Sequence, residues 1–116
     1  MRHYQKYRVW QLAHELVLGT YAVARSLPPS EQYGPASQMK RAAVSVSSNI
    51  AEGSGRGSDT DFCRFLRMAS GSANELENQL LILRDLEFAT ATRVEQLLAQ
   101  TNTLRRGLIQ LIKATS

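Results

Sequence analysis

The chain has 116 residues, 43% of them hydrophobic, which is sufficient for one domain that buries its own core. Its 14 basic and 10 acidic residues give a formal net charge of +4, and eleven of the basic residues are arginines, whose guanidinium suits bidentate phosphate contacts. One cysteine, Cys63, excludes an internal disulfide, and no cysteine pair or histidine cluster has metal-ligand spacing, so we expect no metal and no cofactor.

The first helix is expected at about residues 8–26, and Pro28 and Pro29 end it. The N-terminal segment MRHYQKYRVWQLAHE has scattered charges and no uninterrupted apolar run, so we expect neither a signal peptide nor a membrane span, and a cytoplasmic location. Apolar or small residues recur along this helix at spacings of three and four: Trp10, Ala13, Val17, Thr20, Ala24 and Leu27.

The second helix is expected at about residues 36–52, before the glycine-rich segment Gly53–Gly57. It is rich in alanine and serine, which lets a neighbouring helix approach closely. Its predicted core stripe comprises Met39, Ala42, Ala43, Val46 and Ile50.

The third helix is expected at about residues 58–86, with Ser58 as its N-cap and Asp61 three residues later. Its apolar positions keep a coiled-coil-like spacing over three heptads: Phe62, Leu66, Ala69, Ala73, Leu76, Leu80 and Leu83.

A fourth helix is expected at about residues 91–114, with a similar stripe: Val94, Leu97, Thr101, Leu104, Leu108 and Leu111. Connections this short make consecutive helices antiparallel neighbours. The sequence therefore predicts an all-α fold, with residues 1–116 forming a single antiparallel up-down-up-down four-helix bundle.

Three of these helices carry apolar residues beyond one stripe, and a second apolar face is usually buried against something. The additional residues are Val9, Leu12, Leu16 and Val23 in the first helix, Phe65 and Met68 in the third, and Leu98, Ile109 and Ile112 in the fourth. We therefore expect a cyclic homo-oligomer. Its predicted interface residues are Trp10, Leu12, Leu16, Phe65 and Met68.

Three segments carry a family resemblance: VWQLAHELV, YGPASQMKRAAVSVSSNIAEGSGR and FCRFLRMASGSANELENQLLILRDL. Together they resemble the four-helix bundle family named for the 23S rRNA intervening-sequence protein, over nearly the whole chain. Many members have glycine where this chain has Glu87. At least some members form pentameric rings, so the resemblance implies a homopentamer.

The same family is similar to the accessory variability protein of diversity-generating retroelements. That protein is a basic pentameric barrel that binds nucleic acid and partners a reverse transcriptase. The resemblance therefore implies RNA, DNA or a reverse transcriptase as a partner. We expect no membrane and no small-molecule substrate as partners.

The segment Gly53–Ser58 has two readings. Glycines before a helix can present N–H groups to a phosphate, but here they follow a helix, lack the lysine of a phosphate-binding loop and precede Asp59 and Asp61. A tight turn is the favoured reading.

Four polar residues, Arg41, Asn49, Glu52 and Glu75, lie in segments otherwise suited to packing. Two carboxylates could serve acid–base catalysis, but no nucleophile accompanies them. We interpret the four residues as a structural polar network, and we expect no catalytic residue and no enzyme activity.

The remaining feature is a set of basic residues that could contact nucleic acid: Lys40, Arg56, Arg64, Arg67, Arg105 and Arg106. The leading hypothesis is a basic, oligomeric scaffold or accessory factor that contacts nucleic acid, or a nucleic-acid enzyme, without reading sequence. The alternative is a protein–protein interaction module with no nucleic-acid role.

Overall fold

The computed structural model describes residues 3–116, and this part of the chain is all-α, with four long helices and no strand. The helices are α1 (Arg8–Ser26), α2 (Ser37–Ser54), α3 (Asp59–Asp85) and α4 (Ala91–Thr115). Three short helical segments accompany them: Tyr4–Lys6 before α1, then Pro29–Glu31 and the π-helix Gln32–Ala36 between α1 and α2. The expected four-helix, all-α class is confirmed.

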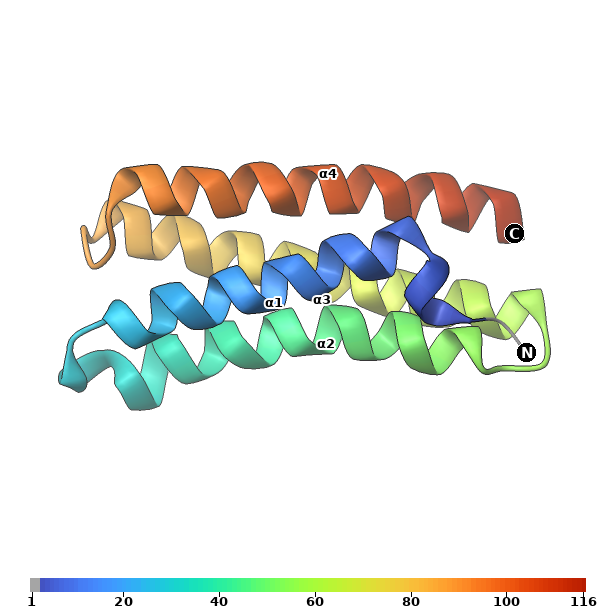
Figure 1. Cartoon of the computed structure of the whole chain (residues 1–116), viewed down its shortest axis with the longest axis horizontal. Helices are drawn as coiled ribbons and strands as arrows, with labels where there is room; N and C mark the ends of the chain where they lie inside the picture. The colour runs from blue at the N-terminus through green and yellow to red at the C-terminus, as the bar shows by residue number, and fades with distance from the viewer. Residues whose placement is uncertain (1–2) are drawn as a thin grey trace.

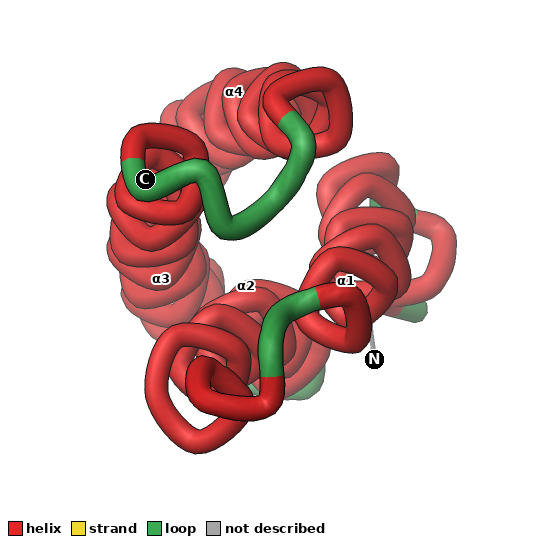
Figure 2. The backbone as a smooth tube through the Cα atoms, turned by 90° about the vertical axis from the view of Figure 1, so that its left-hand side faces the viewer, coloured by secondary structure: helices red, strands yellow, loops and turns green. Residues whose placement is uncertain are grey.

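The helices lie along a common long axis in a body of 44 × 22 × 19 Å, and the chain reverses direction at each connection (Figure 1). Each helix packs against the next, and α1 also packs against α4. The end-on view therefore shows four helices around one centre, with α1 diagonal to α3 (Figure 2).

The core follows the predicted stripes of α2 and α3 without exception. Every residue of the expected α3 stripe is buried, from Phe62 to Leu83, and so is every residue of the α2 stripe, from Met39 to Ile50. On α4 the stripe is buried from Val94 to Leu108, and Leu111 lies half-buried against the core. Burial at about 25 cal/mol per Å² of apolar surface makes this core the main stabilising term.

The buried face of α1 differs from the predicted stripe. Val9 and Leu16 are buried, whereas Trp10 and Val17 lie half-buried at its edge. Ala13 belongs both to the predicted stripe and to the observed buried face of this helix, and apolar residues lie on both sides of Ala13. The apolar residues of α1 that suggested a second face therefore belong largely to the core.

The helix ends are closed by local hydrogen bonds. The Ser58 side chain accepts a hydrogen bond from the N–H of Asp61 at 3.1 Å, which confirms the predicted N-cap of α3. At the end of α1, the Gln32 side-chain amide donates to the carbonyls of Ala24 and Leu27, and the Ala24 carbonyl also accepts from the N–H of Leu27.

Glu87 closes α3 with a φ of 60°, the one non-glycine residue of the described chain with positive φ. Its N–H donates to the Arg84 carbonyl, and the N–H of Phe88 donates to the Leu83 carbonyl. This is the Schellman arrangement, in which the left-handed position usually carries glycine.

Candidate functional site

α2 and α3 approach closely at Gly53, the second-to-last residue of α2. A Cβ atom added to Gly53 would lie 2.5 Å from the Cβ of Phe65 and 3.2 Å from the ring of Phe62. Further along the same pair of helices, the hydroxyls of Ser45 and Ser72 are hydrogen bonded at 2.8 Å. The absence of side-chain bulk on α2 therefore lets Phe65 pack directly over the helix backbone.

We predict that Gly53→Ala lowers the free energy of unfolding. Helix propensity alone would favour alanine by about 1 kcal/mol, but the contact with Phe65 allows no methyl group, and overpacking of this kind costs about 1–3 kcal/mol. Urea denaturation followed by circular dichroism measures the difference. The matched control is Gly71→Ala, at an exposed position of α3 where an added Cβ has no neighbour within 4 Å. This control should gain stability, and a gain in both variants would contradict the packing argument.

Phe65 in turn carries two arginines. The guanidinium carbons of Arg56 and Arg64 each lie 4.7 Å from the centre of the Phe65 ring, which is only 5% exposed. Arg56 pairs with Glu52 at 2.9 Å and Arg64 with Asp61 at 3.2 Å. We call Arg56, Arg64 and Phe65 the arginine cluster.

The two ion pairs of the arginine cluster leave its cations accessible. Both arginine side chains are more than 40% exposed, and exposed pairs of this kind contribute only about 0–1 kcal/mol. The ring therefore orients two guanidiniums that an incoming anion can still reach.

Arg67 lies beside the cluster, as the sequence suggested. It shares with Arg64 a hollow of about 280 Å³ between the start of α3 and the end of α4, which Cys63 also lines. Arg67 makes no ion pair with any residue in 3–116. Three of the predicted basic residues are thus gathered at one end of the bundle.

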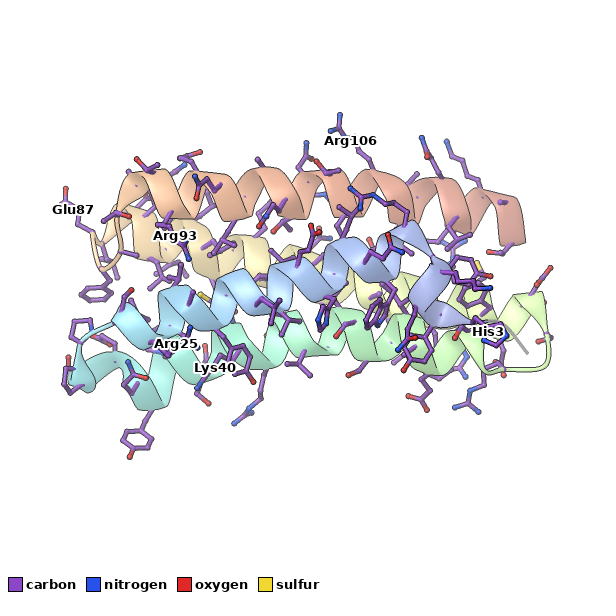
Figure 3. All side chains as sticks on the ribbon, viewed as in Figure 1. His3, Arg25, Lys40, Glu87, Arg93 and Arg106 are labelled. Atoms are coloured by element: carbon purple, nitrogen blue, oxygen red, sulfur yellow. The ribbon has the colours of Figure 1, made fainter. Side chains whose placement is uncertain are left out.

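The doublet Arg105–Arg106 is divided between two roles. Arg105 reaches across to α3, where its guanidinium donates to Asn74 at 3.0 Å and pairs with Glu77 at 2.8 Å. It also donates to Asn102 on its own helix. Arg106 points away from the other helices (Figure 3). The prediction that Arg105 contacts nucleic acid conflicts with this structural role.

The hydrogen bond from Arg105 lowers the pKa of Glu77 below its ordinary value of 4.5. Burial opposes this shift, and the positive charge of Arg105 adds a smaller lowering effect. A lowered folded-state pKa stabilises the fold above the unfolded pKa. This contribution disappears as the pH falls through the folded-state pKa.

Glu77→Gln should therefore lower stability at neutral pH by roughly 0.5–1 kcal/mol. Wild type loses the ion pair when Glu77 is protonated. The difference in free energy of unfolding between wild type and the variant should therefore shrink when the pH falls well below the folded-state pKa. Urea denaturation at neutral pH and at such an acidic pH measures this difference. Glu15→Gln, at an exposed residue of α1 without an ion pair in the described chain, is the control and should show no such narrowing.

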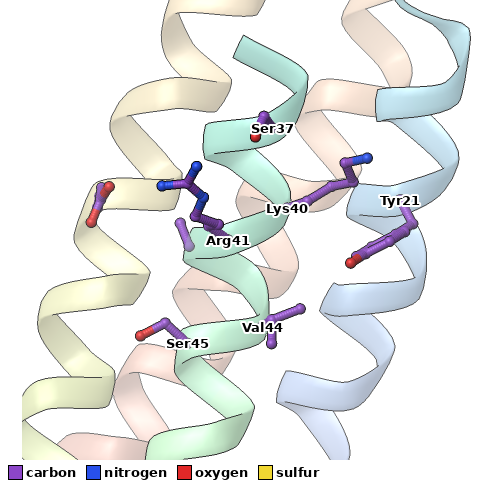
Figure 4. Close-up of a pocket in the computed structure, with 8 residues that line it drawn as sticks. Tyr21, Ser37, Lys40, Arg41, Val44 and Ser45 are labelled. Carbon is purple, nitrogen blue, oxygen red and sulfur yellow. The ribbon is translucent and has the colours of Figure 1, made fainter. Parts of the chain in front are cut away.

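The second doublet, Lys40–Arg41, lies on α2 in an open groove of about 700 Å³ (Figure 4). Lys40 extends toward α1, with its ammonium 5.4 Å from the centre of the Tyr21 ring. Arg41 points to the other side, toward α3, where Glu75 lines the groove. The two cations therefore face different neighbours and do not join the arginine cluster.

The predicted polar network does not assemble. Glu52 pairs with Arg56, and the Asn49 amide donates to the carbonyl and hydroxyl of Ser45, one turn earlier. Arg41 and Glu75 share the groove but form no ion pair within 4 Å. Each group is instead satisfied locally on its own helix or exposed to water.

The five predicted interface residues lie in different environments. Leu16 is fully buried and Phe65 is 5% exposed, so the structure contradicts their placement at an interface. Trp10 and Leu12 are half-buried against the core, and Trp10 also stacks on His14 with ring centres 4.9 Å apart. Met68 is 47% exposed and remains available.

With this geometry established, sequence comparison identifies the family. Residues 5–110 match the 23S rRNA-intervening sequence protein family. The chain belongs to this family. The resemblance that the three sequence segments suggested is confirmed.

One solved structure shows the same architecture. It is the crystal structure of a protein with unknown function from the S23 ribosomal protein family from Bacteroides thetaiotaomicron VPI-5482. Its sequence is 25% identical, the alignment covers 90% of this chain and 98% of that one, and the TM-score is 0.85. No curated protein matches the chain.

Residues 3–116 of this family member lack two kinds of feature. No group of three or more histidine, cysteine, aspartate or glutamate side chains is placed to hold a metal ion. None of the described helices has the length and apolar character needed to cross a membrane.

Sequence reasoning missed two residues near the cluster. Phe65 was read as an interface residue, although arginines at positions 56 and 64 on either side of a glycine turn were a signal for its role. Lys113 lies across from Arg67 in the α3–α4 groove and was not singled out. Its position depends on the register between two antiparallel helices.

Proposed function

We propose that the protein is a non-enzymatic, oligomeric scaffold of the cytoplasm that contacts the phosphate backbone of RNA or DNA without reading sequence. The arginine cluster is the observation that carries this proposal. Two guanidiniums ordered on one phenyl ring, with Arg67 nearby, form a concentrated positive surface for phosphate oxygens.

The titratable groups support a role without catalysis. Two groups have a shifted pKa among the described residues, Glu77 and Arg84, and hydrogen-bonded ion pairs account for both: a partly exposed pair for Glu77 and exposed pairs for Arg84. The pKa of Arg84 is raised chiefly by its hydrogen bond to Asp85, and then by its hydrogen bond to Glu95. General acids and bases usually combine such shifts with a secluded pocket, whereas these pairs lie at the surface.

Exposed apolar side chains support self-association. They occur on all four helices of the bundle: Leu18, Val44, Met68, Ile82 and Ile109. The family resemblance favours five subunits, and five copies with a formal charge of +4 would give a total of about +20. Closing the ring would bring the arginine clusters of neighbouring subunits into one positively charged surface.

Nucleic-acid binding should depend steeply on salt and on the arginine cluster. Fluorescence anisotropy with a labelled mixed-sequence single-stranded RNA, and with a DNA duplex, measures affinity across a salt series. Each lost phosphate contact should reduce the slope of log K against log salt by about 0.7–0.9. Arg56→Ala with Arg64→Ala should therefore lower both the affinity and the slope.

The matched control is Arg25→Ala, which removes an exposed arginine near the opposite end of the bundle (Figure 3). It should change the slope less than the cluster variant does. Undetectable binding of either nucleic acid at low salt would refute the proposed function.

The oligomer has its own test. Light scattering should give a mass of about 65 kDa, five times the 12.9 kDa of one chain. Met68→Asp should reduce this mass because a buried charge without a partner opposes association, whereas Met68→Leu should retain it. A monomer at micromolar concentration would show that the exposed apolar residues do not serve self-association.

A further inference from the structure

A groove between the first half of α3 and the end of α4 has the composition of a docking site for an acidic partner. It consists of two adjoining hollows, of about 590 and 280 Å³, that share Arg67. Lys113 and Arg64 supply two further cations, and no aspartate or glutamate side chain lines either hollow.

The charge of this groove is only partly compensated from within the described chain, where Arg64 pairs with Asp61. Further along the same pair of helices, Arg84 pairs with Glu95 and Arg105 pairs with Glu77, so cations there have partners on the facing helix. Arg67 and Lys113 make no ion pair with residues 3–116. An occupant with carboxylates at two positions would complete the pattern that the other half of the interface already shows.

The groove also has an apolar part. Ile109 is 45% exposed, and Ile112 lies beside it, packed partly against the core. Phosphate contacts alone would leave these side chains in water. An amphipathic helix can cover isoleucine with its apolar face while its acidic residues reach the cations at the rim.

The length of the groove suits a helix of about four turns. Its lining extends along α3 from Thr60 to Asn74, which corresponds to about 21 Å at 1.5 Å per residue. A segment of this size can present apolar residues at spacings of three and four toward the isoleucines.

We propose that this groove binds an acidic amphipathic helix of a partner protein. Carboxylates of that helix pair with Arg67 and Lys113, and its apolar face packs on Ile109 and Ile112. The groove shares Arg64 and Arg67 with the surface proposed for nucleic acid, but its contacts with the helix also rest on Lys113, Ile109 and Ile112. Peptide binding and nucleic-acid binding can therefore fail separately.

The test uses a panel of synthetic, fluorescein-labelled peptides of about four helical turns. They carry glutamates on one face and leucines on the other, in several spacings, and each has a scrambled version of equal composition. At least one peptide should bind the full chain better than its scrambled version. Lys113→Glu and Arg67→Glu should each weaken its binding about tenfold or more, and Ile109→Ser should weaken it without changing the charge.

Two control variants match these changes outside the groove. Arg106→Glu reverses a charge on α4 that points away from the other helices (Figure 3), and Leu86→Ser removes a comparably exposed apolar side chain just after the end of α3. Both should bind the peptide as wild type does. Circular dichroism of every variant separates loss of binding from loss of fold.

Several results would overturn the proposal. These are no binding by any peptide, equal binding of scrambled peptides, or equal losses in the two control variants. Two further results, each obtained without peptide binding, would identify a different occupant. Loss of RNA affinity in Lys113→Glu would assign the groove to nucleic acid. A reduced mass of Lys113→Glu in light scattering would assign it to a second copy of the chain.

Discussion

The close approach of α2 and α3 determines much of the rest of this structure. Gly53 allows Phe65 to lie against the backbone of α2, and Ser45 of the same helix is hydrogen bonded to Ser72 of α3. Once Phe65 is held there, its ring orients Arg56 and Arg64. A packing requirement in the core thus produces an ordered charge pattern on the surface.

The arginines of the chain divide by what faces them. Arg84 and Arg105 are paired with acidic residues and connect α3 to α4, whereas Arg67 and Arg106 have no acidic partner within the described residues. Exposed ion pairs add little stability individually, so those between α3 and α4 matter chiefly for the register of two long helices. Arg67 and Arg106, together with the paired but exposed Arg56 and Arg64, are the arginines accessible to other molecules.

The pattern of apolar residues predicted the four-helix, all-α class and the core faces of α2 and α3, because the α3 stripe keeps one heptad spacing with polar residues around it. On α1 the predicted core stripe was shifted from the observed buried face, because Val9 and Trp10 are both apolar and periodicity alone does not choose between them. The surroundings of the Lys40, Arg41 and Arg105 side chains could not be predicted from their neighbours in the sequence. Neighbouring residues on a helix point about 100° apart, so each doublet faces two different environments.

The first and last helices meet through glycines near opposite ends of the pair. A Cβ atom on Gly19 would lie 2.7 Å from Leu97, and one on Gly107 would lie 3.0 Å from Val9. These contacts join positions about 80 to 100 residues apart, and closing so long a loop costs more conformational entropy than forming the α2–α3 hairpin. We therefore expect the hairpin around Gly53 to order first during folding and the α1–α4 pair to close last, which makes that pair the place where the bundle opens most readily.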